Sequence, residues 1–374
     1  MLPPLWVRTG EGRGGGRHET FRRPGSGGGR RVIRRIHTGL GLLVSVLLLW
    51  LVLRSIGLAS VWDGLLAARW GLLVPALALY FVGVGIRAVR WQVLLAPLKP
   101  VPARRLFPII TIGYMANDVL PARLGEVVRV YVLGRREGVS RAAALATVLV
   151  ERVFDGLCLL VFVGITLPLV APTGAWQGLF WAAAALFGVT ALVLVAIAGR
   201  PSVPLALIEP GIRLLPGGVH RRARDLVAGL VSGLAVLGGV RGSLSALGLS
   251  VLAWLCEAGL YLVLLSALAI EGPPLFPLAL LTTGVANLGT LIPSSPGYVG
   301  VFHYLVQQVL TQAGVALSQA TVYAVLVHAA LIVPVTLVGL YHAWRLGLTL
   351  DWLRAAGRPA AVEGSDRAAS IARS

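Results

Sequence analysis

Long apolar segments separated by shorter polar ones dominate this chain. A helix needs about 20 mainly apolar residues to cross the hydrocarbon layer of a membrane. Six segments meet this requirement, at residues 39–58, 71–95, 142–171, 177–198, 244–270 and 319–344. The pattern therefore predicts an all-α polytopic membrane protein with about six full spans.

Two further apolar segments are interrupted by polar residues, proline and glycine. Residues 106–134 contain Pro121 and Gly125 near their middle. Residues 275–312 contain a longer set of such residues, namely Pro293, Pro296, Gly297 and Gly300. Because proline and glycine disfavour a continuous helix, we expect each segment to form a broken or re-entrant hairpin.

The two ends of the chain and one central segment are polar. Residues 1–38 are rich in glycine and arginine and cannot bury a core, so we expect a disordered basic arm. Three interpretations of this arm stay open: it fixes the orientation of the chain, it tethers the chain to anionic lipid, or its sequence results from a mis-assigned start codon. The predicted transmembrane domain covers residues 39–346, with a cytoplasmic segment at about 200–242, and residues 347–374 are expected to form a polar tail.

Composition supports a membrane protein. Of the 374 residues, 57% are apolar and 13% are charged, whereas soluble domains have about 45–50% apolar and 25% charged residues. This excludes a soluble globular protein. Cys158 and Cys256 lie inside apolar segments, so no disulfide framework is expected. The sequence shows no catalytic triad or metal-ligand spacing, and we predict no cofactor and no enzymatic domain.

The distribution of charge predicts the orientation. The chain has 33 basic and 15 acidic residues, a net charge of +18. Basic residues collect in cytoplasmic loops, so the loops at 99–105, 135–141 and 200–241 are placed in the cytoplasm together with both termini. Because the arginines lie at the ends of apolar segments, anionic headgroups are favoured over nucleic acid as partners. Arg87 and Arg90 are interpreted as part of this basic cytoplasmic interface.

With this orientation, the hairpin at 106–134 enters from the cytoplasm and the hairpin at 275–312 enters from outside. Two broken hairpins that enter from opposite faces resemble the core of an inverted-repeat transporter. An inverted repeat is therefore one interpretation of the pattern.

Ionisable residues gather in and after the first hairpin. A charge at the bilayer centre costs about 2.5–3.5 kcal/mol on insertion scales, so such residues are paired, hydrated or functional. Glu151 and Asp155 are four residues apart and share a helix face. We predict one substrate-binding set here, consisting of Asn117, Arg123, Glu126, Arg129, Glu151, Arg152 and Asp155.

Two interpretations of this set stay open. Its three cations and three anions form a self-neutralising network that fastens the hairpin, or they line a hydrated cavity for a lipid headgroup. Arginine can hold phosphate bidentately, and carboxylates suit an amine or a hydroxyl. The secondary candidates are Asp118, Glu257, Asn287 and His303. The simpler interpretation of Glu257 is that it pairs with an arginine. The simpler interpretation of His303 is a buried ring whose hydrogen bonds are satisfied.

Three motifs stand in order along the chain. The first is Asn117-Asp118-x-x-Pro121-Ala122-Arg123-x-Gly125-Glu126-x-x-Arg129, the second is Val150-Glu151-Arg152-Val153-x-Asp155, and the third is Pro293-x-x-Pro296-Gly297-x-x-Gly300. Together they resemble the lysylphosphatidylglycerol synthase transmembrane region, a flippase-like family that includes the UPF0104 membrane proteins. One departure is Phe302-His303, where the family's third motif often continues with a glutamate.

The resemblance implies a multi-pass protein of a bacterial or archaeal cytoplasmic membrane that moves a phospholipid or a polyprenyl-linked lipid. In relatives this region precedes a soluble aminoacyl-transferase domain, and the sequence ends at residue 374 without one, so synthase activity is not expected. In the flippase hypothesis, Arg123, Arg129 and Arg152 hold phosphate. The alternatives are an intramembrane lipid transferase and a membrane subunit of a separate glycosyl- or aminoacyl-transferase.

Cysteine accessibility tests the predicted orientation of the hairpins. Single cysteines at Ala313 and at Arg141 should react with a membrane-impermeant thiol reagent from opposite faces, because the two hairpins are predicted to enter from opposite sides. Labelling of both positions from the same face would show that the paired-hairpin hypothesis is wrong.

Overall fold

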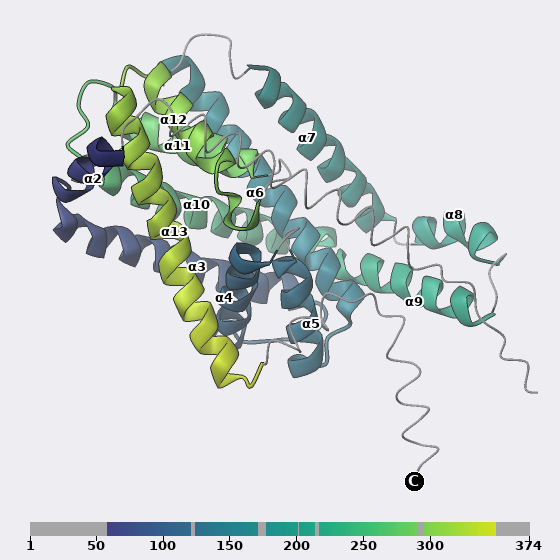
Figure 1. Ribbon diagram of the computed structural model, residues 1–374. Helices are drawn as coiled ribbons and strands as arrows, with labels where there is room; N and C mark the ends of the chain where they lie inside the picture. The colour runs from purple at the N-terminus through teal and green to yellow at the C-terminus, as the bar shows by residue number, and fades with distance from the viewer. Residues whose placement is uncertain are drawn as a thin grey trace, which may run out of the picture. The chain divides into compact units, whose positions relative to one another are not determined.

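The computed structural model describes residues 58–120, 124–170, 177–200, 202–213, 217–290 and 295–348 (Figure 1). These residues form 12 α-helices joined by short 3-10 turns and loops. Five helices in the described part are long and apolar enough to cross a membrane. They are Trp70–Leu95, Arg141–Val170, Phe180–Gly199, Val240–Ala267 and Leu317–Arg345. The prediction of an all-helical polytopic membrane protein is thereby confirmed.

Some predicted segments fall outside the described residues. These are the arm at 1–38, the span at 39–58 except for its last residue, and the tail at 347–374 except for its first two residues. The other five predicted spans each correspond to one of the long helices, with ends that differ by a few residues.

A first group of helices runs from residue 58 to residue 170. It begins with α2 (Leu58–Leu66) and the short turn η1 (Trp70–Leu72). The long helices α3 (Leu73–Leu95) and α6 (Arg141–Val170) then enclose two shorter ones, α4 (Ala103–Val119) and α5 (Gly125–Glu137). The predicted hairpin at 106–134 is therefore a pair of short helices.

A second group repeats this order of lengths. The long helices α10 (Val240–Ala267) and α13 (Leu317–Arg345) enclose the shorter α11 (Leu275–Gly289) and α12 (Val301–Gln312), with the turn η5 (Pro296–Tyr298) between the short pair. Between the two groups lie α7 (Gln177–Gly199), α8 (Ser202–Arg213), α9 (Gly217–Gly233) and η4 (Ala235–Gly238).

The two groups pack against each other through matching helices. The first long helices, α3 and α10, form the most extensive contact, and α4 packs on α13 as α11 packs on α6. The direction of α3 and α10 follows from their hydrogen bonds. Near one end the amide of Arg69 donates to the carbonyl of Ala267 at 2.9 Å, and near the other Arg90 donates to Ser250 at 2.7 Å. The two helices are therefore antiparallel.

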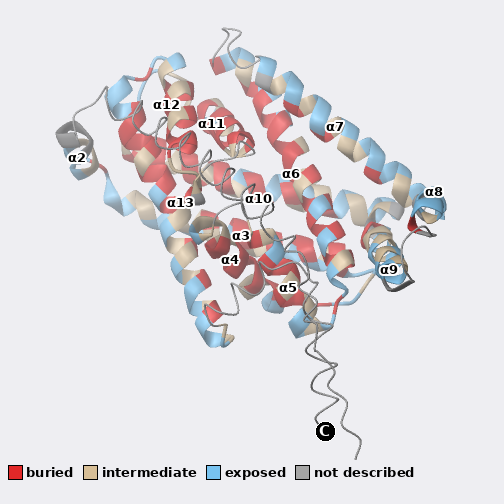
Figure 2. Cartoon of the chain, turned by 45° about the vertical axis from the view of Figure 1, so that its right-hand side comes forward, coloured by how far each residue is buried: buried red, intermediate tan, exposed pale blue. Residues whose placement is uncertain are grey.

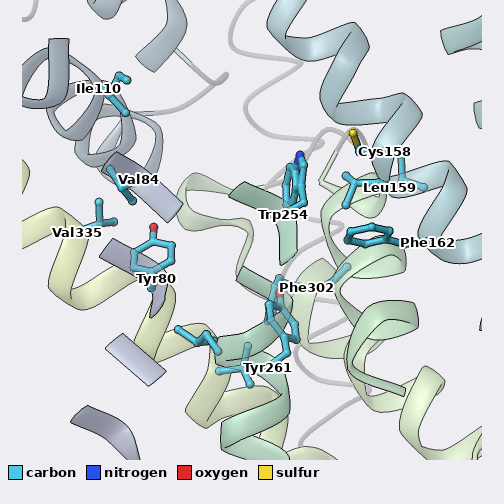
Figure 3. Packing of buried hydrophobic residues seen from close by; sticks show 14 of the residues in the cluster. Tyr80, Val84, Ile110, Cys158, Leu159, Phe162, Trp254, Tyr261, Phe302 and Val335 are labelled. Atoms are coloured by element: carbon cyan, nitrogen blue, oxygen red, sulfur yellow. The ribbon is translucent and has the colours of Figure 1, made fainter. Parts of the chain in front are cut away.

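Burial separates the inner helices from the outer one. Figure 2 shows buried residues along much of α6 and mainly exposed residues along α7, which lies on its outer side. The core between the groups includes Tyr261 and Tyr323, both fully buried, and the hydroxyl of Tyr323 donates to the carbonyl of Tyr261 at 2.8 Å. Figure 3 shows part of this packing, with Tyr80 and Val84 near Val335 of α13.

Glycines make the two breaks in the short-helix pairs. At the first break, the amide of Gly125 donates to the side-chain oxygen of Asn117 at 2.7 Å. A Cβ atom on Gly125 would lie 2.0 Å from the carbonyl oxygen of Gly113, so α5 can begin here only because residue 125 has no side chain. At the second break, Gly297 and Gly300 have φ values of 67° and 91°, which glycine adopts at little cost.

Replacing Gly125 by alanine should destabilise the fold. The added methyl group collides with backbone, and overpacking of this kind typically costs about 1–3 kcal/mol. We expect a lower midpoint of thermal unfolding in detergent. Gly85→Ala is the matched control, because a Cβ atom at this helical glycine meets nothing within 4 Å. Equal midpoints for the two variants would contradict the role given to Gly125.

Candidate functional site

The centre of the site is Arg90, which is fully buried on α3. Its guanidinium donates to both oxygens of Asp155, to Glu151 Oε1 at 3.2 Å and to the hydroxyl of Ser250 at 2.7 Å. Glu151 and Asp155 lie one turn apart on α6, and Ser250 lies on α10. One buried cation therefore joins three long helices.

The network extends from this centre to α5. Arg129 is 3% exposed and its guanidinium donates to Glu151 Oε2 at 2.8 Å. The same guanidinium lies 4.1 Å from the centre of the Trp91 ring, a distance at which a cation is attracted by an aromatic face. The indole nitrogen of Trp91 in turn donates to the hydroxyl of Thr147 at 3.1 Å. These contacts attach the first hairpin to α3 and α6.

The network also extends toward the second group of helices. Arg87 on α3 forms an ion pair with Glu257 on α10 at 2.7 Å, and Asn287 on α11 donates to the other oxygen of Glu257 at 3.1 Å. The guanidinium of Arg87 lies 4.7 Å from the centre of the Trp254 ring. Trp254 donates to Asp155 at 2.9 Å, which connects this ion pair to the Arg90 cluster.

The structure corrects the interpretation of Arg87 and Arg90. They were expected at a basic cytoplasmic interface, but they are 4% and 0% exposed inside the helix bundle. Near the end of an apolar segment, an arginine that reaches the headgroups and one that turns inward give the same sequence pattern. Their spacing of three residues was the available signal, since it places both side chains on one helix face.

A cavity lies beside this network, where the two short-helix pairs are broken. It encloses about 810 Å³, counting the part that opens to the outside. Its walls include residues of α3, α4, α5, α6, α10, α11 and α13. The charged residues that line it are Arg87, Asp118, Glu126, Arg152, Asp155 and Glu257, and the aromatic ones are Tyr80, Tyr114, Trp254, Tyr298 and Phe302.

The described lining of the cavity is rich in negative charge. Two arginines face four carboxylates there. Asp118 accepts a hydrogen bond from Thr336 at 2.7 Å, and Arg152 forms an ion pair with Asp155 at 3.1 Å. Glu126 has no ion pair within the described residues and is only partly buried. The ends of α4 and α11 lie at the same place, and the C-terminal end of a helix carries partial negative charge.

The structure distributes the predicted substrate-binding residues over two layers. The cavity is lined by Asn117, Glu126, Arg152 and Asp155, together with the secondary candidates Asp118, Glu257 and Asn287. Arg129 and Glu151 do not line it and lie in the ion network behind. Pro121, Arg123 and Pro293 lie outside the described residues.

His303 lies beside a second histidine. Its ring centroid is 4.5 Å from that of His328, and His328 Nε2 lies 2.7 Å from the carbonyl oxygen of Gly297 in the second break. His328 lines the cavity, whereas His303 does not. Sequence reasoning also missed Tyr80 and Trp254 as lining residues, because aromatic residues in apolar segments carry no distinguishing signal. Within the described ranges, no three His, Cys, Asp or Glu side chains are grouped as a metal site would require.

The geometry can be compared with known proteins. The sequence matches the family described as Lysylphosphatidylglycerol synthase TM region over residues 39–339. The chain belongs to this family. Every cavity-lining residue lies within the matched range.

Three curated relatives are archaeal. The chain is 30% identical to Glycosyltransferase AglD of Haloferax volcanii over 301 residues, which cover 73% of this chain and 48% of that protein. It is 31% identical over 140 residues to a UPF0104 membrane protein of Methanothermobacter thermautotrophicus, covering 35% of this chain and 41% of the relative. A UPF0104 membrane protein of Methanocaldococcus jannaschii is 26% identical over 166 residues, which cover 42% of this chain and 49% of that protein.

The chain spans about half or less of the length of these relatives. No solved structure matches it.

Replacing Arg90 by alanine should strongly destabilise the protein. The change leaves Glu151 and Asp155 buried without their shared cation, and breaking a buried ion pair on one side costs about 3–5 kcal/mol. The measurement is thermal unfolding in detergent. The matched control is Arg105→Ala, which removes a pair with Glu137 in which the Arg105 side chain is 59% exposed, worth only about 0–1 kcal/mol. An Arg90→Ala midpoint no lower than that of Arg105→Ala would refute the central role of Arg90.

Proposed function

We propose that the protein is a lipid flippase that passes the headgroup of a phospholipid or polyprenyl-linked lipid through this cavity. The observation that supports the proposal is the position of the cavity: it lies where both short-helix pairs break and is lined by charges of both signs. A headgroup that crosses a membrane needs such a polar path, because no water is available in the hydrocarbon region.

The lining residues suit the two parts of a headgroup. Arg152 has a side chain that is 34% exposed and can offer guanidinium hydrogens to a phosphate. Arg123 joins it in this proposal on the basis of its motif. Glu126 and Asp118 can accept hydrogen bonds from an amine or hydroxyl. Arg129, which lies behind the cavity, acts by holding Glu151 in place.

The arrangement of helices supports alternating access. Both groups have the order long, short, short, long, and their first helices run antiparallel. We infer an inverted repeat whose two halves rock around the cavity, as in secondary transporters. In this proposal the chain lies in a cytoplasmic membrane with both termini inside. It acts with lipid alone or beside a separate transferase.

A second candidate follows from the relative that is named a glycosyltransferase. In this alternative the chain is an intramembrane lipid transferase, and Glu126 is the general base because its carboxylate faces the cavity without an ion pair among the described residues. Since the match covers 48% of that relative, the other half can equally carry the named activity. Incubation with a labelled sugar donor and a polyprenyl phosphate distinguishes the two, because only a transferase forms a new glycolipid.

Lipid movement by the purified protein in liposomes tests the proposed function. The assay uses labelled phosphatidylglycerol, its lysyl derivative and a polyprenyl-phosphate sugar. We expect movement of one of these lipids and a loss of several-fold in rate for Glu126→Gln, which removes a cavity charge without breaking an ion pair among the described residues.

The matched control is Glu271→Gln, an exposed position away from the cavity, which should retain the full rate. If the folded protein moves none of the three lipids, or if both variants lose the same rate, the flippase proposal is wrong.

A further inference from the structure

The charged cavity continues into a second pocket. The two share six lining residues, among them Glu126, Asp155 and Trp254. The residues found only in the second pocket are Gly156 and Leu159 of α6, Phe187 of α7 and Leu288 of α11. All four are apolar or lack a side chain, whereas the shared lining carries the charges of Glu126, Arg152 and Asp155. We call the part of the second pocket that the four residues line the apolar pocket.

Phe187 lines this apolar pocket from α7. It is 8% exposed, and a Cβ atom on Gly156 would lie 2.2 Å from its ring. The ring therefore rests directly on α6 where residue 156 has no side chain. Figure 3 shows Leu159 near Trp254, and both line this pocket. Leu288 lines it from α11.

The pocket lies one helix away from the bilayer. The outer face of α7 exposes Leu186, Val189 and Leu192, with 56%, 60% and 73% of each accessible. In a membrane such a face contacts lipid. Among the described helices, α7 makes its main contacts with α6 and η4. Phe187 is therefore carried by a peripheral helix, between the pocket and the exposed face of α7.

We propose that this pocket binds the hydrocarbon chain of a lipid, next to the headgroup, and that Phe187 of α7 gates its lateral entry. The inference rests on the proposed function for the nature of the headgroup. The continuity from charged to apolar lining selects an amphiphile. A free, water-soluble headgroup would fill only the charged part and leave the apolar pocket without a ligand.

Photo-crosslinking tests the proposal on the full chain in lipid nanodiscs. The probes are the three lipids of the transport assay, each with a diazirine in its hydrocarbon chain, and the labelled residues are located by tandem mass spectrometry. We expect one probe to label Phe187 and Leu288 several-fold above Leu192, which reports contact with bulk lipid. Excess unlabelled lipid should reduce only the labelling of the pocket.

Two tryptophan variants provide a matched pair. Leu159→Trp fills the pocket and should abolish labelling of Phe187 and Leu288, whereas Leu192→Trp on the outer face should leave it unchanged. Phe187→Ala provides a second variant that creates space, and it should raise labelling of Leu159 itself several-fold. The proposal is overturned if labelling of the pocket is no stronger than labelling at Leu192. It is also overturned if labelling of the pocket is unchanged in both Leu159→Trp and Phe187→Ala.

The results separate this inference from the proposed function. Saturable labelling of the pocket without lipid movement in liposomes would contradict the flippase proposal and support the chain-binding site. Lipid movement without selective labelling would support the flippase and overturn the chain-binding site.

Discussion

The buried guanidinium of Arg90 sets the main constraint on this structure. A cation removed from water must be neutralised nearby, because its desolvation costs several kcal/mol. Arg90 meets this requirement only if Glu151 and Asp155 on α6 and Ser250 on α10 all stay within hydrogen-bond reach. One side chain therefore constrains the relative positions of three long helices, and the ion pairs of Arg87 and Arg129 extend this constraint to α11 and α5.

The rigid network and the cavity are two layers of one arrangement. The ion pairs behind the cavity neutralise the buried charges of Arg90, Arg129 and Glu151, which would otherwise be costly inside a bundle of apolar helices. The charges in front, such as Glu126, line the cavity. In our proposal, the two interpretations drawn from the sequence, a fastening network and a headgroup cavity, apply to different members of the same set. Arg129 and Glu151 lie in the ion network, and Glu126 and Arg152 line the cavity proposed for the headgroup.

Hydropathy predicted the five described spans and the two broken segments, because span length is set by membrane thickness. Spacing along one helix also indicated that Glu151 and Asp155 act together. Contacts between helices were not predictable in the same way. Arg87 and Arg90 were placed at an interface because their neighbours in sequence suggested it, whereas their partners lie 61 to 170 residues away. The apolar pocket at Phe187 likewise depends on α7 lying against Gly156.

The ion pair between Arg87 and Glu257 has a consequence for how the two halves relate. These residues lie 170 positions apart, which is close to the number of residues that separates corresponding helices of the two groups. They meet where α3 packs against its antiparallel counterpart α10. In the inverted repeat that we infer, a position on the two-fold axis faces its own equivalent, so identical halves would set arginine against arginine or glutamate against glutamate. Such a contact requires two halves that differ in sequence. A single chain that carries both halves guarantees that each arginine-bearing half meets a glutamate-bearing one.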